Sequence, residues 1–254
     1  MNNNSTEIDF RLRDWQAWAP GMSSHKDWLA WIERGGPPAG EERADVSFLP
    51  AMQRRRLGPM ARMVFRVMED TLHDADDHAP MVFASRHGEL ARSYSLLQSL
   101  AEGEPLSPRD FSLSVHNAIL GLHSIARKNR EPATAVAAGL DTLPAGLLET
   151  AVQAAVSQRD CLMVWAEQSI PAFYRHYLPE DAPVACLALR VAPKEDTQAG
   201  PLFRLAWRAV PPGDPAGETA VLQSMLTGLV RPQGRGDWRS ERRAWQLEPV
   251  HVAA

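Results

Sequence analysis

A short apolar segment, a tight turn and a long apolar helix constrain the fold of this chain more than any other feature. Residues 133–138 are apolar and bounded by turn-forming residues, so they predict a buried strand. Gly139 begins the turn, and residues 143–156 predict an apolar helix, which accepts Pro144 because amides of the first turn need no partner within the helix. In a layered α/β enzyme, this turn is where a nucleophile would stand.

Strands and helices are expected to alternate along most of the chain. The predicted helices are residues 24–33, 52–72 with a break at Gly58-Pro59, 90–100, 114–128 and 219–230. The predicted strands are residues 8–18, 81–85, 161–166, 183–191, 202–210 and a final edge strand at 238–247. We expect residues 202–210 to pair with residues 182–191 as an antiparallel hairpin. This order indicates an α/β fold with a mixed central sheet of about five or more strands.

The composition is that of an ordinary globular protein, with 44% apolar and 23% charged residues. A formal charge of -4 gives no reason to expect a nucleic-acid partner. The polar start MNNNSTE is unlike a secretory signal, and no apolar run approaches the roughly 20 residues that span a bilayer. We therefore expect a cytoplasmic protein without a membrane span.

Several clusters of reactive residue types have a plainer structural interpretation. His73 to His78 has metal-binding residue types, but the six residues are contiguous, so a polar connector is favoured and no metal is expected. Ser85 and His87 lack the elbow motif of a nucleophilic serine. Cys161 and Cys186 lie in apolar strands, where a thiol behaves as a small hydrophobe. The tryptophans between residues 8 and 35 could form a ligand-stacking platform, but anchoring of the core or of an interface is the favoured interpretation.

Residues 107–151 resemble the amino-terminal half of beta-ketoacyl synthases, which have the thiolase fold. A longer run, residues 81–151, resembles a narrower group of related proteins that is named below. The family's P-N-x-x-A-G helix corresponds to His116-Asn117-Ala118 through Gly121, and its G-P turn to Glu131-Pro132. Residues 138–142 stand for the family's T-A-C-A-S motif, so Leu140 occupies the position of the nucleophilic cysteine. A shift of one residue would place Gly139 or Asp141 there instead.

The resemblance implies a protein without the family's condensing activity. Leucine offers neither a lone pair nor a charge, whereas the family uses a thiolate at a helix N-terminus. The chain has 254 residues, and no motif of the family's second half follows Gln153. We expect one thiolase-like half-fold over residues 1–254, with a core at 8–160 and closing strands and a helix at 161–248.

The segment FSLSVHN, residues 111–117, matches the F-x-x-S-V-H-N motif of the chain-length factors of aryl-polyene pathways. This resemblance implies a subunit that pairs with an active ketosynthase, meets an acyl carrier protein transiently and needs no cofactor. The side chains expected at the acyl tunnel or the subunit interface are Phe111, Val115, His116, Asn117, Ile119, Leu122 and Leu140. The arginines Arg54, Arg55 and Arg56 are a candidate docking patch for the carrier protein, although a solvated helix face explains them as well.

Two other functions stay open at this point. The chain could be an independent acyl hydrolase or acyltransferase that uses Ser85, His87 or an aspartate. It could also be a homodimeric scaffold or binding protein, for which its tryptophan-rich start would be the supporting feature.

Overall fold

A twisted mixed sheet forms the centre of the computed structural model, which describes residues 5–72, 78–178, 182–231 and 233–251. Eight strands in this part of the chain follow the order β3-β2-β4-β5-β1-β6-β8-β7. The β2–β3 and β2–β4 pairs are parallel, and all other pairs are antiparallel. The strands are β1 (Thr6–Trp18), β2 (Met81–Ala84), β3 (Ala133–Val136), β4 (Cys161–Glu167), β5 (Ala185–Pro193), β6 (Leu202–Ala209), β7 (Gly236–Arg239) and β8 (Arg243–Pro249). The predicted mixed sheet of five or more strands is confirmed.

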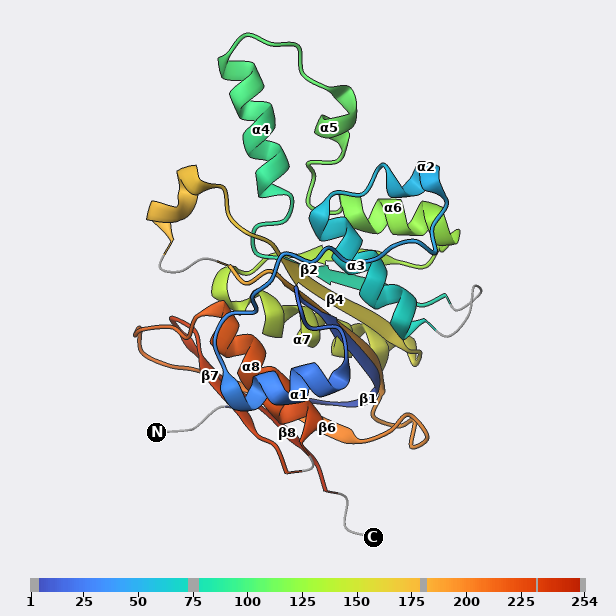
Figure 1. Ribbon diagram of the computed structural model, residues 1–254. Helices are drawn as coiled ribbons and strands as arrows, with labels where there is room; N and C mark the ends of the chain where they lie inside the picture. The colour runs from blue at the N-terminus through green and yellow to red at the C-terminus, as the bar shows by residue number, and fades with distance from the viewer. Residues whose placement is uncertain (1–4, 73–77, 179–181, 232, 252–254) are drawn as a thin grey trace.

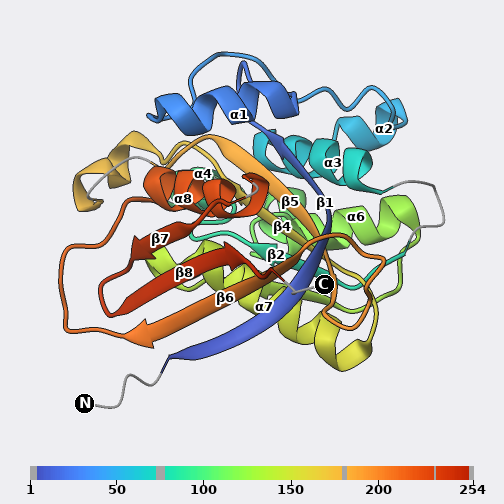
Figure 2. The same ribbon diagram turned by 90° about the horizontal axis from the view of Figure 1, so that it is seen from below.

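Helices cover both faces of the sheet (Figure 1, Figure 2). Leu187 and Leu189 of β5 belong to a hydrophobic cluster with α1, α7 and α8, whereas Cys186 and Ala188 belong to a second cluster with α3 and α6. Because neighbouring strand residues point to opposite faces, the two clusters lie on opposite sides. The helices are α1 (His25–Arg34), α2 (Ala51–Arg54), α3 (Pro59–Thr71), α4 (Leu90–Ala101), α5 (Pro108–Ser112), α6 (Ala118–Arg127), α7 (Thr142–Ser157) and α8 (Glu218–Val230), with short 3₁₀ helices η1 (Gly139–Asp141) and η2 (Ala172–Tyr177).

Local sequence signals explain the helix boundaries well. Ser24 begins α1 through a reciprocal capping box with Asp27, at the start of the helix predicted for residues 24–33. Pro59 opens α3 after the expected break at Gly58. Trp28 and Trp31 are fully buried, which confirms the prediction that tryptophans in this region anchor the core.

The predicted hairpin between residues 182–191 and 202–210 is wrong. Strand β1 lies between β5 and β6 and pairs antiparallel with both, as Figure 2 shows. A hairpin is the usual result when two strands are joined by a short loop, but here the first strand of the chain enters the gap. Periodicity marks which residues form strands, and it carries no information about such a distant partner.

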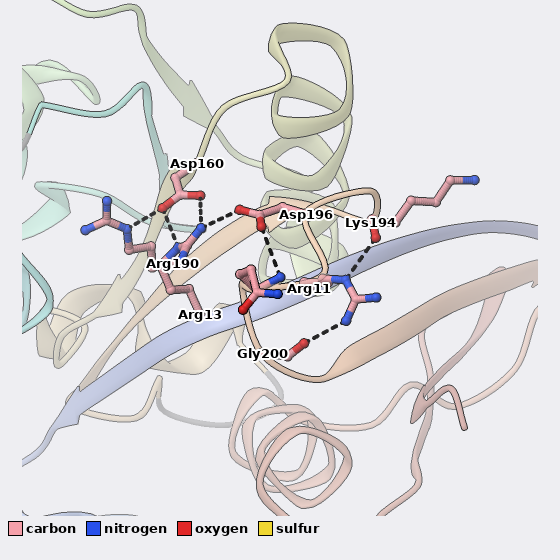
Figure 3. Close-up of polar contacts among 8 residues, drawn as sticks. Arg11, Arg13, Asp160, Arg190, Lys194, Asp196 and Gly200 are labelled. Atoms are coloured by element: carbon pink, nitrogen blue, oxygen red, sulfur yellow. Dashed lines mark hydrogen bonds and ion pairs between the residues drawn. The ribbon is translucent and has the colours of Figure 1, made fainter. Parts of the chain in front are cut away.

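An ion-pair network holds β1 in this inserted position (Figure 3). Asp160, before β4, accepts from Arg13 of β1 and Arg190 of β5, at 2.7 Å each. Arg13 also reaches Asp196 in the β5–β6 connection at 2.6 Å. Arg11 donates to the backbone oxygens of Lys194 and Gly200 at 2.9 and 2.8 Å, so β1 is tied to both ends of that connection.

Three further predicted elements need correction. Residues 133–136 form an edge strand, β3, which is partly exposed, because only β2 pairs with it. The helix predicted at 114–128 begins at Ala118, since residues 114–117 form turns after the separate helix α5. The strand predicted at 238–247 is two strands, β7 and β8, joined by a turn at residues 240–242. Of these two, β7 lies at the edge of the sheet, opposite the β3 edge.

Helices α4 and α5 extend away from the sheet as a helical arm, residues 90–112 (Figure 1, green). The arm and its base expose several large apolar side chains, namely Leu97, Leu100, Leu106, Phe111 and Val115. The helix η2 packs beside the arm, with Phe173 stacked on Tyr94 at a ring distance of 5.6 Å. Exposed apolar surface of this extent is typical of sites that contact another molecule.

Candidate functional site

The turn between β3 and α7 has the strand, tight turn and helix arrangement that the sequence predicted. Gly139 adopts a positive φ of 60°, a conformation in which glycine avoids the strain of a side chain. Thr142 fastens the turn, because its hydroxyl donates to the Gly139 carbonyl at 2.7 Å and accepts from the Ala138 amide at 2.9 Å. Helix α7 then runs through the core, where the close approach of Gly146 to Ala84 packs it against β2.

Leu140 lies half-buried in this turn and faces a hollow of about 240 Å³. The hollow is lined by the turn itself, by Arg86 and by residues 240–243 of the β7–β8 turn. The side chains of residues 111–122, which were expected to act together with Leu140, do not line it.

Asp141, next to Leu140, is held by two side chains of β8. One carboxylate oxygen accepts from Arg243 and the other from the indole nitrogen of Trp245, each at 2.8 Å. Asp141 is 9% exposed, and the carboxylate stands at the helix N-terminus, where negative charge is stabilised. Sequence analysis missed this group, because about a hundred residues separate Asp141 from its partners and no local pattern joins them.

Ser85 and His87 do not form a hydrolytic pair. The Ser85 hydroxyl donates to the buried carboxylate of Glu167 at 3.2 Å and accepts from the Gly88 amide at 2.8 Å. Burial and the neighbouring Arg86 charge lower the pKa of His87 to about 4. The segment is therefore a loop that follows the end of β2, which agrees with the absence of the elbow motif.

The two cysteines are unsuited to thiolate chemistry. Both are buried and free. Burial raises the pKa of the Cys161 thiol to about 12 and raises the pKa of Cys186 well above its usual value. A buried thiol of this kind stays protonated and inert.

The expected tunnel and interface residues lie around the base of the arm, in different environments. Phe111 and Val115 are 62% and 48% exposed, and Asn117 is exposed as well. Leu122 is half-buried, whereas Ile119 packs fully into the core cluster beneath α6.

His116 is half-buried and contacts Phe83 of β2 and Ser85, which follows β2. Its Nε2 lies 2.7 Å from the carbonyl oxygen of Ser85, and its ring lies 5.6 Å from that of Phe83. A side chain at Gly88 would collide with the ring, at 2.9 Å. His116 therefore fixes the segment that leads from β2 into the arm.

The three arginines proposed for carrier docking lie at α2, beside the base of the arm. Arg54 and Arg55 line a hollow of about 340 Å³ together with Arg62. Arg109 of α5 donates to the Arg55 carbonyl at 2.8 Å, and Arg62 of α3 approaches that of Arg54 at 3.4 Å. Arg54 ends α2, Arg55 and Arg56 follow it directly, and Arg62 and Arg109 come from α3 and α5. We call these five arginines the basic patch; Asp45 also lines its hollow.

Within the described residues, no group of three metal-ligating side chains is present. Most of the His73 to His78 segment, residues 73–77, lies outside the part that the structure describes. No described helix has the length and apolar character needed to cross a bilayer.

The model of the beta-ketoacyl synthase N-terminal domain matches residues 28–246. The chain belongs to the beta-ketoacyl synthase family. Its eight-stranded sheet with helices on both faces is the thiolase-like half-fold that the resemblance implied. Comparison with curated proteins found no match.

Two solved structures illustrate the similarity. One contains the ketosynthase ApeO in complex with its chain length factor ApeC from Xenorhabdus doucetiae, with 28% identity and a TM-score of 0.79, covering 95% of this chain and 99% of that chain. The other is a beta-ketoacyl synthase from Burkholderia phymatum STM815, with 10% identity and a TM-score of 0.63, covering 86% and 69% of the two chains. The second likeness concerns the fold alone. The chain is thus a ketosynthase-like subunit.

Proposed function

We propose that this chain is a non-catalytic, chain-length-factor-like subunit that pairs with an active ketosynthase and limits the length of an acyl or polyene chain, in aryl-polyene-type biosynthesis. The main support for this proposal is the set of side chains at the start of α7. Leu140 has no reactive group, and both oxygens of the neighbouring Asp141 are already engaged by Arg243 and Trp245. A side chain that could hold an acyl group at this helix end is therefore lacking in either register.

The similarity to the ApeO–ApeC structure supports this function, because the likeness covers 95% of the present chain. ApeO is a ketosynthase, and ApeC is its chain length factor. A ketosynthase is accordingly the partner that we infer for the present chain.

An uncovered strip along β3 is the surface that we propose for this pairing. The free edge of β3 offers unpaired backbone groups, which favour the addition of another strand. Ile125 of α6 is 74% exposed on one side of the strip, and Val156 of α7 is 82% exposed on the other. A groove of about 420 Å³ runs along α6, where the exposed Gly121 leaves room for an opposing side chain. Burying this surface would remove apolar area from water.

Chain length would be limited by excluded volume. Phe111 and Val115 project at the base of the arm, where they are available to close the end of a partner's tunnel. An acyl chain that meets such side chains can extend no further without overpacking, which costs roughly 1–3 kcal/mol. Both residues lie in the FSLSVHN segment that carries the sequence resemblance.

A carrier protein is the second partner that we propose, and the basic patch of five arginines is its docking site. Carrier proteins of such pathways are acidic, so opposite charge would speed the encounter. Replacing Arg55 and Arg56 by glutamate should slow carrier-dependent elongation more at low salt than at high salt. A loss of rate that is independent of salt would contradict this role.

Product length in a reconstituted pair tests the proposal directly. The chain would be co-purified with its candidate ketosynthase, and Phe111→Ala and Val115→Ala compared with Leu29→Ala, which truncates an exposed apolar side chain of α1, far from the arm in Figure 1. We expect longer products from the two arm variants and unchanged products from the control. Failure to co-purify, or identical product masses for all variants, would refute the proposal. Sizing the chain alone distinguishes a homodimeric scaffold, and labelling by an activated acyl thioester would instead indicate an independent enzyme.

A further inference from the structure

Helix α5 carries Phe111 and has no core of its own. None of its five residues is buried, and residues 101–106, which lead into it, are all exposed. A helix shorter than roughly 12 residues is marginal in water when nothing packs against it. Apolar burial therefore contributes little to holding α5, and its place in the arm depends on individual side-chain contacts.

Two arginines make such contacts between α5 and the rest of the chain. Arg92 of α4 reaches across the arm, and its Nη1 lies 2.6 Å from the carboxylate of Asp110. Arg109 of α5 donates to the carbonyl oxygen of Arg55 at 2.8 Å, which ties α5 to the segment after α2. The pair of Arg92 with Asp110 thus joins the two helices of the arm one residue before Phe111.

Arg92 is itself held in place at the base of the arm. Its Nε lies 3.3 Å from the carboxylate of Glu89, which is only 8% exposed. A Cβ added at Gly58 would lie 3.0 Å from its Nη2, so the guanidinium lies close to the residue that precedes α3. Burial raises the pKa of Glu89, and the positive charge of Arg92 opposes that rise.

This arrangement makes the contact with Asp110 stronger than an ordinary surface ion pair. Such pairs contribute little, partly because two long side chains must be ordered at once. Here Glu89 already orders the guanidinium, whose planar fork can bond two carboxylates together. Only the shorter side chain of Asp110 remains to be fixed.

We propose that Arg92 is a positioning residue for the control of chain length. Through Asp110 it fixes α5, and thereby Phe111, relative to α4. The inference rests on the proposed function, in which Phe111 closes the end of a partner's tunnel. A side chain that stops extension by excluded volume selects one length only if it stays in one place. Without Arg92, Phe111 samples several positions and products of several lengths result.

Hydrogen–deuterium exchange in the purified full chain tests whether Arg92 holds α5. Arg92→Met and Asp110→Ala break the same pair from its two sides, and the second variant leaves Glu89 its cation should the first fold poorly. In both, we expect the protection of the amides of residues 109–114 to fall at least threefold. Asp110→Glu keeps the carboxylate and should keep the protection. Glu104→Ala removes a charge from another exposed position of the arm and should also leave it unchanged.

Product masses from the chain reconstituted with its candidate ketosynthase test the consequence. Arg92→Met and Asp110→Ala should broaden the range of product lengths, whereas Asp110→Glu and Glu104→Ala should keep the wild-type range. In a Phe111→Ala background, Arg92→Met should add no further change, because Arg92 acts through Phe111. General destabilisation would instead lower the yield of all products in both backgrounds.

The outcomes separate this inference from the proposed function. Wild-type protection of α5 in folded Arg92→Met and Asp110→Ala would overturn the inference, whatever the products. An unchanged product range alongside shifted products from Phe111→Ala, or a further change by Arg92→Met in that background, would overturn it as well. Wild-type products from Phe111→Ala would instead refute the role of Phe111 in the proposed function, and exchange in the chain alone would still decide whether Arg92 holds α5.

Discussion

Replacing Glu167 by glutamine should remove a large pH dependence from the stability of this protein. Glu167 ends β4 with no exposed surface. One of its oxygens accepts from the Ser85 hydroxyl and the Arg86 amide, and the other has no hydrogen-bond partner within the described residues. Burial raises the pKa of Glu167 to about 8 from its usual 4.5, and the nearby Glu218 adds to the rise.

The direction of the effect follows from proton binding. Between pH 4.5 and about 8, the folded protein keeps the proton on Glu167, while the unfolded chain releases it. The stabilisation associated with the neutral acid is therefore complete below pH 4.5 and is lost as the pH rises through about 8. At about 1.4 kcal/mol for each tenfold change in the acid constant, the loss amounts to roughly 5 kcal/mol.

Glutamine keeps the accepting oxygen and cannot ionise. Its amide nitrogen would be buried without an acceptor, which costs roughly 1–3 kcal/mol at every pH. The informative quantity is therefore the change with pH in the stability difference between wild type and Glu167→Gln, because all other titrating groups are common to both proteins. Urea unfolding followed by tryptophan fluorescence at pH 5, 7 and 9 measures it. A constant difference over this range would show that the buried carboxyl is not the titrating group and refute the reasoning.

Three further predictions concern the start and the packing of α7 and the cysteines. Arg243→Ala should lower the unfolding free energy by roughly 1–3 kcal/mol, because Asp141 loses its ionic partner. Arg242→Ala, at the adjacent exposed arginine, is the control and should change the unfolding free energy by less than about 0.5 kcal/mol. Gly146→Ala should destabilise the folded protein by roughly 1–3 kcal/mol, since the added Cβ would lie 2.6 Å from the Cβ of Ala84. Gly121→Ala, which adds a Cβ in open space on α6, is the control and should be neutral or slightly stabilising. In the native protein at pH 8, both cysteines should resist alkylation by iodoacetamide, and in urea-unfolded protein both should react. Mass spectrometry measures the adducts, and an adduct on the native protein would contradict the burial of the cysteines.

Local patterns predicted most elements of this fold, because their information lies within short windows of sequence. The break before α3 at Gly58-Pro59 and the long apolar helix α7 are examples. Pairing between distant strands was not predictable in this way. Strand β1 lies between β5 and β6 and is held there by contacts such as the ion pair of Arg13 with Asp160. The two residues of this pair are far apart in the chain.

The candidate site shows the same limit. The motif comparison identified Leu140 as the residue at the usual nucleophile position, and that assignment of position stays a prediction. The sequence did not reveal that Arg243 and Trp245 of β8 reach back to Asp141. A local motif cannot indicate a carboxylate whose hydrogen-bond partners both lie in a distant part of the chain.

These contacts show how the N-terminal end of α7 is stabilised within this chain. Helix α7 runs through the core, and its N-terminus would expose unpaired amides and a partial positive charge if nothing covered it. Asp141 neutralises that charge, and β8 in turn covers Asp141 with a cation and an indole donor. Side chains of β8 therefore stabilise the end of the helix at which we propose the nucleophile position to lie. The apolar surface that stays exposed lies elsewhere, on the arm and along β3, where contact with a partner rather than chemistry is the function we infer.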